Sequence, residues 1–139
     1  MNEYFKKTIV LATKAFNNDE VPVGAVVVKN GKMIGMGYNK KNKSKIVTDH
    51  AEIIAINMAA KKIGDWRLND CELYVSLEPC NMCKEVIKHA RIKKVYYLVK
   101  SNFYNENGRE IKYIESEYID DIAMIKYKNL LKCFFSSKR

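Results

Sequence analysis

Residues 71–99, CELYVSLEPCNMCKEVIKHARIKKVYYLV, decide the fold of this 139-residue chain. The segment begins at 71–77 with an apolar run rich in residues that favour strands, which predicts a buried strand. Pro79 then precedes a stretch of helical periodicity that continues to Ala90, and proline is best tolerated in the first turn of a helix. A second apolar run at 93–99 predicts another strand. Because strand–helix–strand units cross over in the right-handed sense, we expect these two strands to be parallel.

The segment before this unit predicts a hairpin between two helices. Residues 23–29 and 32–38 have strand character, and the Asn-Gly pair between them is a strong signal for a two-residue hairpin turn. Apolar residues recur at helical spacing in residues 4–16 before the hairpin and in residues 51–62 after it. Both stretches are therefore predicted to be amphipathic helices that cover a sheet.

The last third of the chain predicts a loop, a short strand and a long helix. Residues 101–110 are polar and rich in Asn, and IKYIE at 111–115 is a candidate fifth strand. One face of a final helix carries five regularly spaced apolar residues: Ile119, Ala123, Tyr127, Leu130 and Phe134. The order of elements predicts one α/β domain over residues 1–139, with three α-β-α layers around a five-stranded mixed sheet.

The chain is basic overall. Lysine and arginine outnumber aspartate and glutamate by 25 to 16, a formal net charge of +9. This excess suits a nucleic-acid partner, and it equally suits a lysine-rich surface that serves solubility. No apolar run approaches the roughly 20 residues of a membrane helix, and the N-terminus lacks the apolar block of a secretory signal. We therefore expect a cytoplasmic protein without a membrane segment, in which disulfides do not form.

Three residues of the types that bind zinc lie near predicted helix starts. Cys80 and Cys83 form a Cys-x-x-Cys pair where the helix dipole favours thiolates, the form that binds metal. Alone, the pair also fits a redox role or two incidentally buried cysteines. His50 supplies a third ligand, and three protein ligands with an open fourth position are typical of a catalytic zinc site, whereas a structural site closes with four.

A fourth ligand would close such a site, so the remaining candidates matter. Cys71 shares a predicted strand face with apolar residues, which suits the core. His89 lies nearly two helical turns beyond Cys83, too far down the helix to reach a metal at its start. Cys133 falls in the final helix. We therefore expect an open site with three ligands.

Two acidic residues flank His50. Glu52 is either a first-turn glutamate stabilised by the helix dipole or the proton carrier that metal-assisted hydrolysis requires. The presence of His50 and the cysteine pair favours the proton carrier. Asp49 is expected to be the N-cap of the helix, for which aspartate is among the best residues, rather than a group that orients His50 or contacts substrate.

The sequence HAE at 50–52 followed by PCNMC at 79–83 resembles the zinc signature of the cytidine and deoxycytidylate deaminase superfamily. The resemblance extends into the flanking sequence and narrows to the adenosine and guanine deaminase branch. Four segments are similar to the bacterial tRNA-specific adenosine deaminases: EVPVGAVVV at 20–28, GYN at 37–39, LYVSLEPCNMC at 73–83 and KHARIKKV at 88–95.

The resemblance implies a zinc-dependent hydrolytic deaminase. Zinc would be held by His50, Cys80 and Cys83, and water would attack C6 of adenine. Glu52 would carry the protons, and Asn39 would hydrogen-bond the target base. The implied substrate is the wobble adenosine of a tRNA anticodon, converted to inosine with release of ammonia, and the implied assembly is a homodimer.

The loop after the fourth predicted strand departs from the family. VKSNFYNENG, the start of the altered 99–110 loop, replaces a charged stretch that the relatives use on RNA. Two alternatives therefore stay open: a deaminase of a free base or nucleoside of the guanine or cytosine type, and a non-catalytic, zinc-stabilised RNA-binding module. Lysines at 40–45 and in the final helix favour RNA, because phosphate contacts require cations beside a base pocket, and Phe135 is expected to be exposed among the latter.

Overall fold

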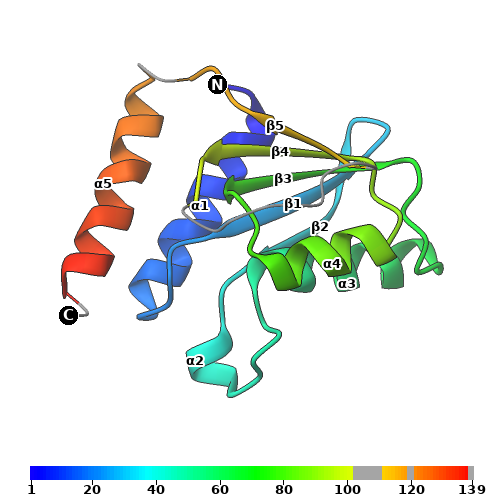
Figure 1. Ribbon diagram of the computed structural model, residues 1–139, viewed down its shortest axis with the longest axis horizontal. Helices are drawn as coiled ribbons and strands as arrows, with labels where there is room; N and C mark the ends of the chain where they lie inside the picture. The colour runs from blue at the N-terminus through cyan, green and yellow to red at the C-terminus, as the bar shows by residue number, and fades with distance from the viewer. Residues whose placement is uncertain (102–110, 119–120, 138–139) are drawn as a thin grey trace.

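A five-stranded mixed sheet forms the centre of the structure, a computed structural model that describes residues 1–101, 111–118 and 121–137 (Figure 1). The strand order is β2-β1-β3-β4-β5. β1 is antiparallel to both β2 and β3, whereas β3, β4 and β5 run parallel to one another, as predicted for the first two of these. The strands are β1 Gly24–Lys29, β2 Lys32–Tyr38, β3 Cys71–Leu77, β4 Lys94–Val99 and β5 Lys112–Glu115. Each predicted strand is confirmed to within one residue.

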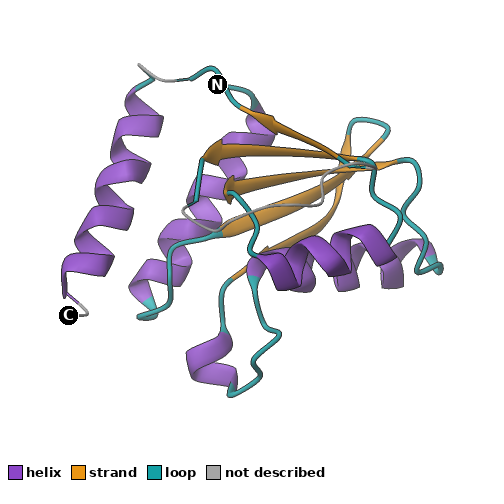
Figure 2. Ribbon diagram, viewed as in Figure 1, coloured by secondary structure: helices purple, strands orange, loops and turns teal. Residues whose placement is uncertain are grey.

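Helices cover both faces of the sheet, which confirms the predicted α-β-α layers. Figure 2 shows α1 and α5 on one face and α3 and α4 on the other. A short helix, α2, stands apart at one end of the sheet and was not predicted, because its sequence is lysine-rich and buries no side chain. The helices are α1 Glu3–Asn17, α2 Lys41–Ser44, α3 Ala51–Ile63, α4 Asn81–His89 and α5 Ile122–Ser137.

Alternating side chains of the central strands build a separate core on each face. Val26 and Val28 of β1 pack on the side of α1, whereas Ala25 and Val27 pack on the side of α3 and α4. Because β1 is covered on both faces, its residues are apolar almost without interruption. Cys71 is buried in the core on the α3 side, which confirms the expected core role.

Two glycines of β2 allow α3 to lie directly on the sheet. A Cβ atom on Gly35 would come within 2.2 Å of the Ala55 carbonyl oxygen, and one on Gly37 within 2.4 Å of the Ala51 carbonyl oxygen. Any larger residue would push the helix away, since real Cβ atoms do not approach backbone oxygen this closely. The start of α3 is therefore held at a fixed height above the sheet.

The buried face of the final helix agrees only in part with the predicted one. Its buried residues are Met124, Tyr127, Leu131 and Phe134. Tyr127 and Phe134 were predicted correctly, Ala123 and Leu130 are only half-buried, and Ile119 lies outside the described residues. The predicted loop at 101–110 also lies outside them, except for Ser101. None of the helices in the described part of the chain combines the length and apolar character needed to cross a membrane.

Candidate active site

The helix starts that carry the predicted ligands meet at one edge of the sheet. β2 and β3 point the same way on either side of β1, so α3 and α4, which follow them, begin at the same edge. His50 is the N-cap of α3, and Cys80 is the N-cap of α4. Ligands of α/β sheets bind at the carboxyl ends of such strands, because the loops diverge there.

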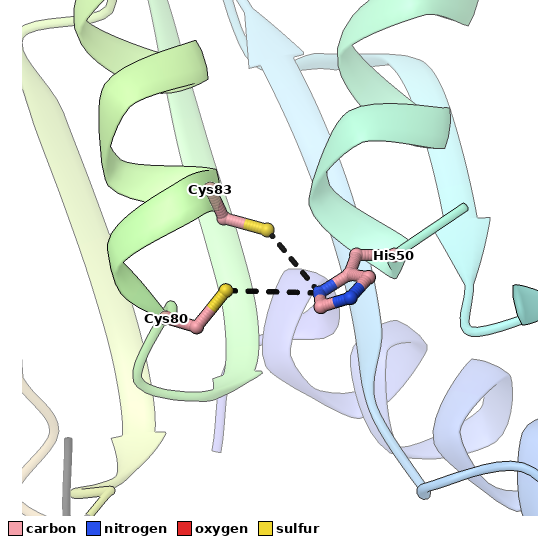
Figure 3. Close-up of side chains that lie close together, drawn as sticks. All are labelled: His50, Cys80 and Cys83. Carbon is pink, nitrogen blue, oxygen red and sulfur yellow. Dashed lines mark hydrogen bonds between the residues drawn. The ribbon is translucent and has the colours of Figure 1, made fainter. Parts of the chain in front are cut away.

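His50, Cys80 and Cys83 come together in a geometry that fits a metal ion (Figure 3). The Nδ1 atom of His50 lies 3.5 Å from the Cys83 sulfur and 3.8 Å from the Cys80 sulfur. Two ligands of a tetrahedral zinc ion at normal bond lengths lie about 3.6–3.8 Å apart. One imidazole nitrogen and two sulfurs are also a donor set that zinc prefers. The three residues therefore fit zinc as the sequence predicted.

The other candidate ligands lie elsewhere. Cys71 is buried in the core, and Cys133 is exposed on α5. His89 is exposed near the end of α4, where its Nε2 atom lies 3.8 Å from a carboxylate oxygen of Glu85. Within residues 1–101, 111–118 and 121–137, no further histidine, cysteine or carboxylate joins the cluster. A metal bound there would keep a fourth position for water or substrate.

Hydrogen bonds among the three candidate ligand side chains shift their pKa values. A hydrogen bond from the Cys83 thiol lowers the pKa of Cys80 to about 4. The same contact, together with burial, raises the pKa of Cys83 well above its usual range. A hydrogen bond with Cys80 raises the pKa of His50. The metal-free site is therefore a Cys80 thiolate between two proton donors, and metal binding must displace their protons.

Glu52 is buried in the first turn of α3, beside this cluster. Burial, which disfavours the charged carboxylate, raises the pKa of Glu52 to about 7. A carboxyl group with a pKa near the working pH can both accept and donate a proton, which is what general acid–base catalysis requires. A surface glutamate attracted by the helix dipole would instead be exposed and readily ionised.

Asn39 ties the end of β2 to the start of α3. Its Oδ1 atom accepts a hydrogen bond of 2.8 Å from the Ala51 N–H, and its Nδ2 atom donates one of 3.0 Å to the Val21 carbonyl. Both contacts fix the orientation of the amide at the edge of the site. The sequence predicted a residue that contacts substrate here, but not this link between backbone segments.

The prediction that Asp49 caps α3 is wrong. His50 occupies the N-cap position without a capping hydrogen bond from its own side chain, and Asn39 satisfies the Ala51 N–H instead. Asp49 lies one residue earlier, in a turn where its N–H donates to the Ile46 carbonyl. Its own carbonyl accepts the Lys40 N–H. The cap comes from a different segment, so the local sequence could not reveal it.

A cavity of about 260 Å³ opens beside the cluster. Four predicted residues line it: Asn39, His50, Glu52 and Cys80. Cys83 is fully buried behind them. Phe135 of α5 also lines the cavity and is half-exposed, so the final helix contributes to its rim as well as packing on α1.

Two further carboxylates at the cavity were not predicted. Glu20 is buried, and its two oxygens accept the N–H groups of Asn42 at 3.0 Å and Lys43 at 2.9 Å, which holds α2 against the end of α1. Glu78 is buried on the wall next to Cys80. Each adjoins an apolar strand segment, but glutamates are mostly exposed in proteins, so the sequence did not indicate that these two are buried.

Comparisons with known proteins agree with this site. Residues 1–99 match the family described as the cytidine and deoxycytidylate deaminase zinc-binding region. The chain is 44% identical over 94 residues to a tRNA-specific adenosine deaminase of Agrobacterium fabrum. That match covers 68% of this chain but only 62% of the relative's length.

Two solved structures have the same fold. One comes from studies of A-to-I editing by tRNA:A34 deaminases, with 33% identity, a TM-score of 0.76, and coverage of 81% of this chain and 96% of that one. The other is a guanine deaminase from Bacillus subtilis, with 42% identity, a TM-score of 0.68, and coverage of 72% and 66%. With its matching signature, fold and ligand cluster, the chain belongs to the cytidine and deoxycytidylate deaminase zinc-binding family.

Proposed function

We propose that the protein is a zinc-dependent hydrolytic deaminase that converts the wobble adenosine of a tRNA anticodon to inosine and releases ammonia. The observation that carries this proposal is a buried carboxyl group, Glu52, beside an open cluster of three ligands at a cavity. A structural zinc site has no use for such a group, because it needs no proton carrier.

The site residues divide the work between binding and proton transfer. His50, Cys80 and Cys83 would hold zinc, which would supply the Lewis acidity that lets water lose a proton near neutral pH. Glu52 takes one proton from the water and delivers it to N1 of the ring. It then takes the remaining proton from the hydroxyl group added at C6 and delivers it to the amine, which departs as ammonia. Burial favours the protonated form of this carboxyl group, which helps it to donate as well as accept a proton.

Asn39 is proposed to orient the base. Its amide is already held by Ala51 and Val21, which use one donor and one acceptor. One N–H and one oxygen lone pair remain available at the cavity. Because this amide is already held in place, it can bind the edge of a purine without the entropy cost of ordering the side chain.

The size of the cavity and the charge around it support an RNA substrate. A space of about 260 Å³ suits a single base, so a nucleic acid must extrude its target nucleotide. An anticodon base is already partly unstacked, which lowers that cost. Lys41 of α2 lines the cavity, and Lys43 lies on the same short helix. The named substrates of the two tRNA deaminase relatives agree with this choice.

A free purine base is the second candidate substrate. The 42% identity to a guanine deaminase structure favours it, because that likeness is close to the 44% identity to a tRNA-specific adenosine deaminase. The cavity accommodates a free base as well as an extruded one. The lysines near the cavity would contribute binding affinity for RNA but not for a free base, because only RNA carries phosphates.

Ammonia release from a substrate panel tests the proposal. We expect an anticodon stem-loop with adenosine at the wobble position to be deaminated with kcat/KM at least ~10³-fold above that of adenosine, adenine, guanine or cytosine, because contacts remote from the base contribute binding energy to the reaction. A stem-loop with guanosine at the wobble position is the matched control and should release no ammonia.

Other outcomes would replace the proposal. Turnover of guanine or cytosine without turnover of RNA would make the protein a free-base deaminase. RNA binding without deamination of any substrate would make it a binding module. For the proposed function, RNA affinity should fall steeply between 50 and 200 mM salt, by about tenfold or more, as phosphate contacts require.

We further propose that the protein is a homodimer, as its family resemblance implies. Large apolar residues are exposed on α3 and directly before and after it: Ile46, Val47, Met58 and Trp66. Light scattering should give about 32 kDa, twice the chain mass of 16.1 kDa. Met58→Glu should shift the protein to 16 kDa, whereas Val10→Glu on α1, also an exposed apolar position, should not. A monomeric wild type would refute the dimer.

A further inference from the structure

Glu78 is a buried carboxylate at a junction of elements beside the cavity. It follows β3 directly, and its N–H donates a hydrogen bond of 2.9 Å to the Val99 carbonyl, which extends the pairing of β3 with β4 by one residue. Its side chain is 7% exposed and lines the cavity wall next to Cys80. Beyond this point the chain leaves β3 towards α4 and leaves β4 towards Ser101.

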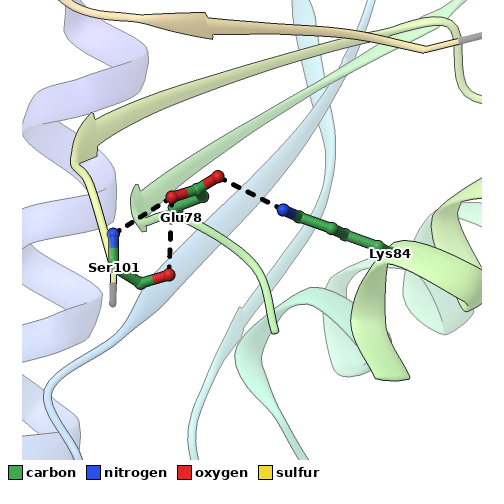
Figure 4. Close-up of polar contacts among 3 residues, drawn as sticks. All are labelled: Glu78, Lys84 and Ser101. Carbon is green, nitrogen blue, oxygen red and sulfur yellow. Dashed lines mark hydrogen bonds and ion pairs between the residues drawn. The ribbon is translucent and has the colours of Figure 1, made fainter. Parts of the chain in front are cut away.

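The two carboxylate oxygens of Glu78 bind partners on different elements (Figure 4). Oε2 lies 3.2 Å from the ammonium nitrogen of Lys84, which is itself buried in α4 immediately after Cys83. Oε1 accepts the N–H of Ser101 at 3.1 Å and its hydroxyl at 3.4 Å. One side chain therefore joins the ends of β3 and β4 to the helix that carries two ligand cysteines.

Lys84 extends the junction to the edge of the sheet. Its ammonium nitrogen lies 5.0 Å from the ring centroid of Tyr113 in β5, within the range of a cation–π interaction. A buried lysine held by a carboxylate and an aromatic ring has little freedom to move. The carboxylate of Glu78 is in turn fixed in the one orientation that faces Ser101.

This arrangement replaces backbone pairing where the sheet ends. Parallel strands carry regular hydrogen bonds only as far as they run together, and β4 ends at Val99. The Ser101 N–H lies two residues beyond and bonds to the Glu78 side chain instead of a neighbouring strand. Because both oxygens of Glu78 are occupied and its charge is balanced by Lys84, it is poorly suited to carry protons during the reaction.

We propose that Glu78 is a positioning residue: held by Lys84, it joins the backbone at Ser101 to the cavity wall that Glu78 itself lines, and so determines substrate binding rather than the chemical step. The kinetic part of this proposal rests on the proposed deaminase function. The structural part, the restraint on Ser101, does not. The two parts can therefore fail separately.

Amide hydrogen exchange at Ser101, measured by NMR on the zinc-loaded protein, tests the restraint directly. In Glu78→Ala the Ser101 N–H should exchange about 10-fold or more faster, because a hydrogen bond to a charged acceptor is lost. Glu78→Gln should behave similarly, because the amide has only one oxygen. The Lys84 ammonium attracts that oxygen, which leaves the amide nitrogen facing the Ser101 N–H.

The double variant Glu78→Gln/Lys84→Met supplies a rescue. With the ammonium gone, the glutamine oxygen can face Ser101, and protection should return towards the wild-type value. The double variant also keeps the test informative if the single variants fold poorly, because it leaves no buried charge unpaired. Glu85→Gln, at an exposed carboxylate of the same helix, is the matched control and should leave Ser101 unchanged.

Kinetics on whichever panel substrate the wild type deaminates test the consequence for binding. Glu78→Ala should raise KM about 10-fold and change kcat by less than about threefold, with zinc content unchanged. Unchanged exchange at Ser101 would overturn the restraint. A fall in kcat at unchanged KM would overturn the assignment to binding and place Glu78 in the chemistry. A wild type inactive on every substrate would refute the proposed function and leave the exchange result to decide the restraint.

Discussion

Replacing Glu52 with glutamine should lower kcat for deamination about 10³-fold while zinc content stays at the wild-type level. The side chain keeps its shape and burial but loses the ability to accept the proton from water and pass it on, and such transfers typically contribute 10²–10⁴-fold. Steady-state ammonia release and metal analysis of the same preparation check both halves of the expectation. Retention of full kcat by the variant would remove Glu52 from the mechanism.

The same substitution should have a stability signature in the metal-free protein. The pKa of Glu52 is raised from 4.5 to about 7, so its contribution to stability is fully present below about pH 4.5 and is lost as the pH rises through 7. Metal-free Glu52→Gln has no such group to ionise. It should therefore be more stable than the metal-free wild type at pH 8, by up to about 3 kcal/mol, and equally stable at pH 4. Urea unfolding at both pH values measures this difference.

Replacing Cys83 with serine should abolish zinc binding and, with it, deamination. Cys83 is fully buried and lies 3.5 Å from His50 Nδ1, so its loss leaves two ligands, too few to hold zinc tightly. The variant should contain less than about 0.1 zinc per chain and should lose the stabilisation that saturating zinc gives the wild type, about 4 kcal/mol at a thousandfold excess over Kd. Metal analysis and thermal unfolding measure both effects.

Two comparisons sharpen this expectation. Cys133→Ser, at the exposed cysteine of α5, should bind zinc and react as the wild type does. Zinc binding to the wild type should release protons near neutral pH, because the pKa values of His50 and Cys83 are raised in the metal-free site. Calorimetry in buffers of different ionisation enthalpy detects that release. Stoichiometric zinc in Cys83→Ser would show that the ligand set is different.

The sequence predicted the features whose causes are local. The Asn-Gly turn of the hairpin needs two residues of left-handed backbone, and Asn30 and Gly31 adopt φ values of 50° and 77°. The sequence predicted the ligand cluster for the same reason, because each ligand lies at or near a helix start that the neighbouring residues define. Once the strands were predicted correctly, their common direction brought His50 and Cys80 to one edge.

What the sequence could not predict depends on partners far along the chain. Asn39 replaced Asp49 at the start of α3 because two distant segments come together there. The buried face of α5 is a similar case: Ala123 and Leu130 fit the helical period as well as Met124 and Leu131 do, and packing in the folded chain buries the second pair. α2 has no apolar face at all, and the distant Glu20 carboxylate accepts two of its backbone N–H groups.

The glycines beneath α3 have a consequence for how this protein can change. Because Gly35 and Gly37 let α3 lie directly on the sheet, a side chain at either position would displace the helix that carries His50 at its start and Glu52 in its first turn. New substrate preferences can then arise around that helix start, through α2, the end of β4 and the rim contributed by α5. A mutant library aimed at altered substrate scope should concentrate there and leave Gly35 and Gly37 untouched, since any larger residue at these positions would push α3 away from the sheet.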